Sequence, residues 1–176
     1  MVGKINNTIV FSYDSDKLFN DVSLLSAYMV KNLGNENGSL LDGFAITGDE
    51  KDVYEVCLSQ TLPDIYEHII KTTSGVTDAF KTETISADEG QTGLMRPKGT
   101  YVVVSVKDNE AYNENILSLV EPTLYDCIKY GTLSEFYSVN LNADLLSLAR
   151  AKFNECLSQL NRRLFQLKKK SVKSLY

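Results

Sequence analysis

The last third of the sequence carries one long, regular stripe of apolar residues. From residue 142 to residue 167 most of them recur at spacings of three or four, which places them on one face of an α-helix. They are Leu145, Leu148, Phe153, Cys156, Leu157, Leu160, Leu164 and Leu167. Asn142 is a favourable N-cap for this helix. Because about 27 helical residues span about 40 Å, which outreaches a domain this small, we expect the end near Leu164 and Leu167 to pack on a neighbouring subunit as well as on the core.

The first half of the chain predicts three shorter helices. One is capped by Asp14 or Ser15 and runs to about Asn32, and its apolar face comprises Leu18, Val22, Leu25 and Met29. Residues 34–39 contain two glycines and two asparagines and predict a turn. Thr47 and Glu50 match a capping box for a second helix over residues 51–60. Pro63 lacks the N–H that a helix interior needs, so we expect a break there and a third helix through residue 70.

A further helix is predicted over residues 109–130, with Pro122 as a kink. Gly131 allows this helix to stop or bend before residues 133–139 resume it. Strands are expected at residues 9–11, 76–85 and 101–106, the last being the clearest because it is rich in β-branched residues. The insert between the last two strands, residues 86–99, is long for a hairpin turn and favours a functional or mobile loop.

These elements predict a single α+β domain over residues 1–167, followed by a basic tail over residues 168–176. The domain is expected to be mainly an α-helical bundle with a small antiparallel β-sheet or hairpin and a long C-terminal helix. A chain of 176 residues with 43% hydrophobic residues can bury a proper core. The polar N-terminus does not predict a signal peptide, and no apolar run approaches the ~20 residues that span a bilayer.

Charge is unevenly distributed along the chain. Residues 161–176 carry six basic side chains and no acidic one, so residues 1–160 carry −11 against −5 for the whole chain. Such a tail can remain solvated, or it can contact nucleic-acid phosphates or an acidic neighbouring subunit. No helix-turn-helix or zinc-finger pattern predicts sequence-specific DNA binding.

Residues that could carry out chemistry form no recognisable set. The single histidine, His68, lies on a predicted helix and is interpreted as a polar surface residue. The three cysteines, Cys57, Cys127 and Cys156, are widely spaced and predict reduced thiols. Phosphate-loop, dinucleotide-binding, zinc-protease and EF-hand motifs are absent from the sequence. Acidic clusters at 49–52 and 108–110 coincide with expected helix starts, where carboxylates are favoured by the helix dipole. We therefore expect no enzyme activity, no cofactor and no metal.

Three stretches resemble a known group of proteins. They are Asn113–Tyr130, Glu135–Tyr137 and Asp144–Lys169. Together they resemble the paired C-terminal helices of small virion proteins from Bacteroidetes phages, including the crAss-like podoviruses. The resemblance implies a structural subunit of a cyclic homo-oligomer, a dodecamer or a hexamer, in the head–tail connector or tail. Its partners would be further copies of itself, the portal or other neck and tail proteins, and phage DNA contacted non-specifically. It would assemble in the host cytoplasm, reside in the virion and not contact a membrane.

Candidate interface residues follow from this resemblance and from the charge pattern. They are Leu94, Met95 and Arg96 in the predicted loop, and Arg162, Arg163, Leu164, Leu167, Lys168 and Lys169 at the C-terminal end. Two other functions stay open at this point. One is a cytoplasmic bacterial adaptor or regulatory module that binds a single protein partner. The other is a small enzyme that uses carboxylates and a divalent metal ion.

Overall fold

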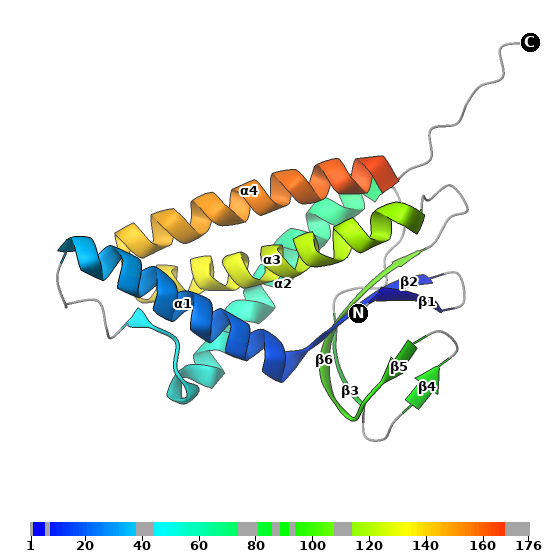
Figure 1. The fold of residues 1–176 in the computed structure, drawn as a ribbon, viewed down its shortest axis with the longest axis horizontal. Coiled ribbons are helices and arrows are strands. Elements are labelled where there is room, and N and C mark those ends of the chain that lie inside the picture. The colour runs from blue at the N-terminus through cyan, green and yellow to red at the C-terminus, as the bar shows by residue number, and fades with distance from the viewer. Residues whose placement is uncertain are drawn as a thin grey trace, which may run out of the picture.

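The computed structural model describes residues 2–5, 8–37, 44–73, 81–85, 89–91, 94–107 and 114–167. Its strands are β1 (Val2–Ile5), β2 (Thr8–Asp14), β3 (Lys81–Ile85), β4 (Glu89–Gln91), β5 (Leu94–Arg96) and β6 (Gly99–Lys107). Its α-helices are α1 (Ser15–Asn37), α2 (Lys51–Thr73), α3 (Glu114–Val139) and α4 (Ala143–Leu167), and a 3-10 turn, η2 (Gly48–Glu50), leads into α2. The helices form a bundle, and the sheet lies at the end where α3 begins (Figure 1). The predicted α+β class, mainly helical with a small antiparallel sheet, is confirmed.

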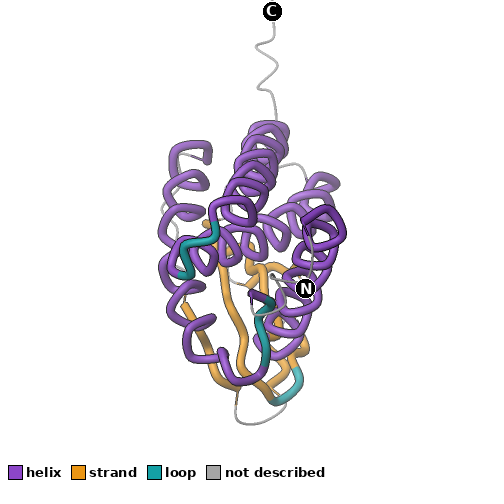
Figure 2. The backbone as a smooth tube through the Cα atoms, turned by 90° about the vertical axis from the view of Figure 1, so that its left-hand side faces the viewer, coloured by secondary structure: helices purple, strands orange, loops and turns teal. Residues whose placement is uncertain are grey.

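The sheet is antiparallel, with the strand order β1-β2-β6-β3. Its centre is the pairing of β2 with β6, where Phe11 faces Val104 and Tyr13 faces Val102. Because successive side chains of a strand point to opposite faces, these four residues turn one face of the sheet toward the helices and join the main core. In the view turned by 90°, the strands are seen between and behind the helices (Figure 2).

The helices are longer than the sequence predicts, and two of the expected breaks are wrong. Helix α2 continues through Pro63, and α3 continues through both Pro122 and Gly131. An interior proline costs a helix about 3 kcal/mol. Buried side chains on both sides of Pro63, among them Leu62 and Ile65, offset that cost because each apolar side chain contributes about 1.5–3 kcal/mol when buried.

Helix α1 also extends further than expected. It passes through Gly34 and ends at Asn37, so the turn predicted at residues 34–39 is wrong over its first four positions. Leu33 packs against the core just before them. Glycine and asparagine each lower helix stability by about 1 kcal/mol or less, which is too little to end a helix that the core already holds.

The insert at residues 86–99 is not a plain loop. Its described part contains the antiparallel hairpin of β4 and β5, in which Gly90 faces Met95. The strand predicted at residues 76–85 is present from Lys81, and residues 76–80 lie outside the described part of the chain. The strands expected at residues 9–11 and 101–106 are confirmed as parts of β2 and β6.

The connection between α3 and α4 is a tight turn in which Leu141 has a left-handed backbone, with φ of 52°. The N–H of Asn142 donates to the carbonyl of Tyr137 (3.2 Å), and the N–H of Leu141 donates to that of Ser138 (3.4 Å). This pattern is a Schellman motif, which usually has glycine at the left-handed position. Asn142 then caps α4 by accepting the Leu145 N–H at 3.0 Å, so the predicted N-cap is confirmed.

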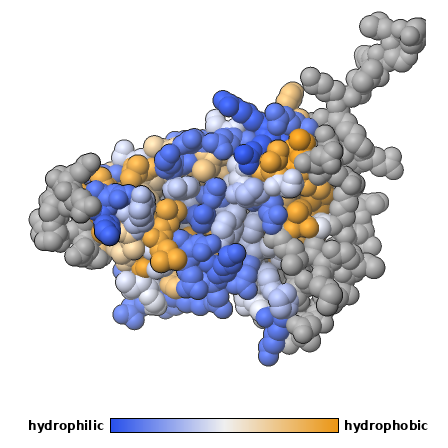
Figure 3. Space-filling model, in the orientation of Figure 1, coloured by the Kyte–Doolittle hydropathy of each residue, from blue (hydrophilic) through white to orange (hydrophobic). Residues whose placement is uncertain are grey.

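Several large apolar side chains lie on the surface. Val139 and Leu141 are 60% and 89% exposed at the α3–α4 turn, which we call the turn end. Leu119 and Phe165 are 45% and 68% exposed where α3 begins and α4 ends, which we call the sheet end. Apolar surface gathers in separate places on one face of the molecule, one of them at the sheet end (Figure 3).

Candidate functional site

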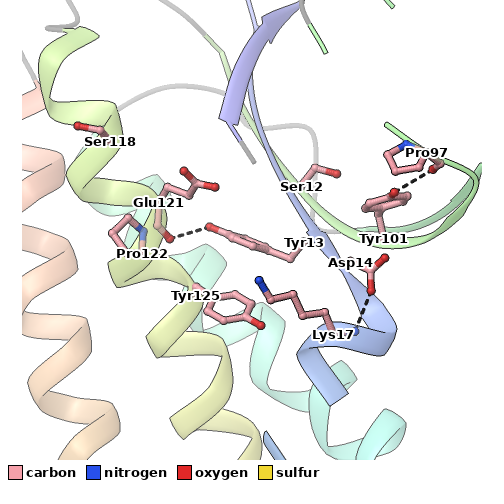
Figure 4. Close-up of a pocket in the computed structure, with 10 residues that line it drawn as sticks. All are labelled: Ser12, Tyr13, Asp14, Lys17, Pro97, Tyr101, Ser118, Glu121, Pro122 and Tyr125. Carbon is pink, nitrogen blue, oxygen red and sulfur yellow. Dashed lines mark hydrogen bonds between the residues drawn. The ribbon is translucent and has the colours of Figure 1, made fainter. Parts of the chain in front are cut away.

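A pocket of about 530 Å³ opens where the sheet meets α1 and α3. Segments far apart in the sequence line it (Figure 4). They contribute Ser12, Tyr13, Asp14, Lys17, Pro97, Tyr101, Ser118, Glu121, Pro122 and Tyr125. Three tyrosines and two prolines give the pocket a mostly apolar wall, which is typical of ligand and peptide sites.

The three tyrosine hydroxyls are held by the protein itself. Tyr13 donates to the backbone carbonyl of Glu121 at 2.9 Å, which joins β2 to α3. Tyr125 donates to Oδ2 of Asp21 at 2.7 Å, which joins α3 to α1, and Tyr101 donates to the carbonyl of Pro97 at 2.8 Å. The rings of Tyr13 and Tyr125 lie 5.2 Å apart at 37°. The tyrosine wall is therefore preorganised.

Both core-facing phenols of the pocket are neutral at ordinary pH. Burial raises the pKa of Tyr13 well above its usual value, and the charge of Glu121 adds to this effect. Burial and the hydrogen bond to Asp21 likewise raise the pKa of Tyr125. Since their protons are used internally, these hydroxyls offer a ligand only the lone pairs of their oxygens.

Lys17 supplies a cation at the pocket. Its backbone N–H donates to Oδ1 of Asp14 at 2.7 Å, so Asp14 is the N-cap of α1. Its side chain extends toward Tyr13 and Tyr125 (Figure 4). In the described part of the chain the ammonium of Lys17 has no hydrogen-bond or ion-pair partner. It is thus available to an acidic group or a carbonyl of a bound segment.

The polar groups of the pocket are hydroxyls, two carboxylates and one amine. No histidine or cysteine is among its ten lining residues, so a nucleophile with an adjacent imidazole base is not assembled there. His68 lies elsewhere, on α2, with its Nδ1 3.3 Å from Nδ2 of Asn161 in α4. It is half-buried, so its side chain is partly exposed as well as in contact with α4. The described residues contain no group of three histidine, cysteine, aspartate or glutamate side chains that could hold a metal ion.

The acidic clusters of the sequence have structural explanations where they are described. Asp49 and Glu50 lie in η2, and Asp52 lies in the first turn of α2. The Glu50 carboxylate accepts hydrogen bonds from the backbone N–H of Thr47 at 2.7 Å and from its hydroxyl at 3.0 Å. The second cluster, residues 108–110, lies outside the described residues.

The predicted interface residues fall into different environments. Arg162 is exposed on α4, whereas Arg163 donates to the carbonyl of Leu119 and to the hydroxyl of Thr123 and so braces α4 against α3. Leu164 is only 1% exposed and packs in the chain's own core. A partner therefore has access to Arg162 and to the neighbouring Phe165 more readily than to Leu164.

The remaining predicted interface residues belong to β5 and to the C-terminal end of the chain. Leu94, Met95 and Arg96 form β5, and Leu167 ends α4. Lys168 and Lys169 lie outside the described residues. A contact of any of these residues with a neighbouring subunit stays a prediction.

Sequence reasoning missed both the tyrosine pocket and the exposed apolar residues at the two ends. The pocket combines segments that no local pattern connects. The sequence did indicate an exposed apolar residue at Phe165. This residue follows the buried Leu164 directly, so it cannot lie on the same helix face as the apolar stripe.

Comparisons of this chain with protein-family models, with curated proteins and with solved structures find no match. None of the described helices is both long enough and apolar enough to cross a membrane.

Proposed function

We propose that this protein is a non-enzymatic structural subunit of a ring in the head–tail connector or tail of a tailed bacteriophage. It would act by packing against further copies of itself, with no bond made or broken. The observation that supports this proposal most is the exposure of large apolar side chains at two opposite ends of the α3–α4 pair.

Two separated patches fit the geometry of a ring. A closed ring needs head-to-tail contacts in which one surface of a subunit meets a different surface of the next. The turn end offers Val139 and Leu141, and the sheet end offers Leu119 and Phe165. Full burial of a leucine or phenylalanine contributes about 1.5–3 kcal/mol, so these four residues could supply the apolar centre of one such interface.

The charge distribution supports the same arrangement. The chain has an acidic body and a basic C-terminal end, and Arg162 is exposed close to Phe165. A basic rim around an apolar centre would meet acidic residues of the neighbouring subunit and guide its orientation. The assignment to a phage neck, with the portal and other neck or tail proteins as neighbours and DNA as a non-specific contact, rests on the resemblance of the last third of the sequence.

The test is the mass of the purified protein by native mass spectrometry or mass photometry. The proposal predicts one high, fixed copy number, such as six or twelve. Leu141→Asn at the turn end and Phe165→Ser at the sheet end should each lower the copy number while circular dichroism stays unchanged. Val56→Ser removes a comparably exposed valine from α2, a helix that contributes no residue to either end as defined above, and serves as the control. A monomer at every concentration, or equal effects of all three variants, would contradict the proposal.

The tyrosine pocket favours a second candidate function, that of a protein-binding adaptor. A preorganised aromatic wall with an available lysine suits an extended segment of a partner protein. Under this alternative the protein is a monomer that captures one partner, and Lys17→Ala together with Tyr101→Ala abolishes capture. If instead those substitutions leave every measured association unchanged, the adaptor function is excluded.

A further inference from the structure

Two of the three cysteines lie opposite each other in the antiparallel pair of α3 and α4. Leu141 marks the middle of the turn between these helices, and Cys127 and Cys156 lie at nearly equal numbers of residues before and after it. Residues so placed reach the same level of a helical hairpin. Both side chains join the main core cluster, Cys127 as a fully buried residue and Cys156 as a partly buried one packed against it.

The two thiols lie close enough for a hydrogen bond between them to shift both of their pKa values. This bond lowers the pKa of Cys156, and the positive charge of Lys129 acts in the same direction, whereas burial and the carboxylates of Asp126 and Glu155 oppose them. The same hydrogen bond, together with burial, raises the pKa of Cys127. The partly exposed sulfur is therefore the more nucleophilic of the pair.

We propose that Cys127 and Cys156 are an oxidation site, at which a peroxide converts the two thiols into a disulfide that links α3 to α4. The Cys156 thiolate first attacks one oxygen of the peroxide. The O–O bond breaks, Cys156 becomes a sulfenic acid, and the leaving oxygen takes up a proton and departs as water or an alcohol. The sulfur of Cys127 then attacks the sulfur of Cys156, its proton passes to the departing hydroxyl, and a second molecule leaves as water.

Because Cys127 is buried and Cys156 is partly exposed, the two cysteines take different parts in the reaction. Cys156 meets the oxidant because its side chain is partly exposed, and Cys127 resolves the sulfenic acid because it is already in contact. Redox-active pairs commonly combine one accessible cysteine with one resolving cysteine. Cys57, in α2, is fully buried, and its pKa is raised by burial and by the charge of Glu135. It provides an internal control.

The disulfide would fix the middle of the helical hairpin. It closes a loop that contains half of α3, the strained turn and half of α4, and such loops reduce the entropy of the unfolded chain. The expected result is a rise in Tm of about 5–10 °C on oxidation. This inference does not depend on the ring proposal, because the pair lies within one chain.

The experiment treats the reduced full-length protein with hydrogen peroxide and analyses it by intact mass and non-reducing peptide mapping. The wild type should lose two hydrogen atoms and yield a peptide pair joined through Cys127 and Cys156. The control Cys57→Ser should behave in the same way. Cys127→Ser should stop at a sulfenic acid on Cys156 that a dimedone probe traps.

If Cys127→Ser does not fold, Cys156→Ser still tests the proposal, because its site is partly exposed. In that variant Cys127 should stay a free thiol under the same treatment, since it lacks its reactive partner. A linkage that involves Cys57, a disulfide between two chains, or no disulfide in the wild type would each overturn the proposal.

Discussion

Gly131 of α3 lies so close to Thr61 of α2 that no side chain fits between them. A β-carbon built on Gly131 would overlap the γ-methyl group of Thr61 and would lie 3.0 Å from the ring of Phe153 in α4. Three helices thus converge at this glycine. Its role is close packing of α3 against α2 and α4, and α3 continues through it.

Gly131→Ala is therefore expected to destabilise the protein, although alanine favours helices. Overpacking costs typically about 1–3 kcal/mol, whereas the gain in helix propensity is about 1 kcal/mol. Because the overlap with Thr61 is severe, the cost lies in the upper part of that range, and denaturant unfolding should show a net loss of about 1–2 kcal/mol. Thr61→Ser in the same chain removes the overlapping methyl group, keeps the hydroxyl that donates to the Cys57 carbonyl, and should recover part of the loss. A neutral or stabilising Gly131→Ala would show that the helices can separate freely.

Leu141→Gly should stabilise the monomer. A left-handed backbone costs a residue with a β-carbon about 1 kcal/mol, and glycine avoids this cost. We expect a gain of about 0.5–1 kcal/mol in the free energy of unfolding. The control Ala143→Gly, two residues later in the first turn of α4, should lose stability, because that position has a regular helical backbone. If both variants lose stability equally, the strain at Leu141 is not significant.

Adjacent arginines at the end of α4 should differ in their effects. Arg163→Met removes the hydrogen bonds to Leu119 and Thr123 and should lower the free energy of unfolding by about 1–2 kcal/mol. Arg162→Glu leaves the fold intact, because that side chain is exposed, and should weaken association in a salt-dependent manner. Thermal denaturation and mass photometry on the same two variants separate the effects. An equal loss of stability in the two variants would contradict the different roles that we assign to Arg162 and Arg163.

Buried tyrosines should make the protein sensitive to alkali. The pKa values of the Tyr13, Tyr54, Tyr125 and Tyr137 phenols are raised above the usual 10.0, in each case mainly by burial. The unfolded chain loses these protons near pH 10, whereas the folded chain retains them. The stability that these four groups contribute is therefore fully present below that pH and is lost as the pH rises above it.

Ultraviolet absorbance of tyrosinate tests this pH dependence. Of the ten tyrosines, these four should ionise only together with the loss of helical circular dichroism. Tyr137→Phe removes a buried hydroxyl that has no hydrogen-bond partner. It should reduce the absorbance change that accompanies unfolding at high pH, and it breaks no hydrogen bond of the folded protein. Ionisation of all ten tyrosines in one step near pH 10, with the helices intact, would contradict the predicted burial.

Local patterns in the sequence correctly predicted the features that depend on residues close together in the chain. The Asn142 cap, the Thr47–Glu50 contact and the strand over residues 101–106 are all set by near neighbours in the chain. Helix continuity at Pro63 and Gly131 could not be predicted in this way. It depends on what α2, α3 and α4 bury against one another, which a single sequence does not reveal.

The candidate site illustrates the same limit. Tyr13, Tyr101 and Tyr125 were visible as scattered tyrosines, but only the fold brings β2, β6 and α3 to one pocket. Cys127 and Cys156 were predicted as separate reduced thiols, and their contact follows from the level at which α3 and α4 pair. Apolar residues off the stripe, such as Phe165, are the one surface feature that periodicity could have revealed.

The most direct test is the mass of the native protein at micromolar concentration, measured for the wild type beside Leu141→Asn and Phe165→Ser. A single ring-sized species in the wild type, converted to monomer by either substitution, is the predicted result. A wild type that stays monomeric throughout, with its apolar ends in water, would contradict the proposal that these ends are covered by neighbouring subunits.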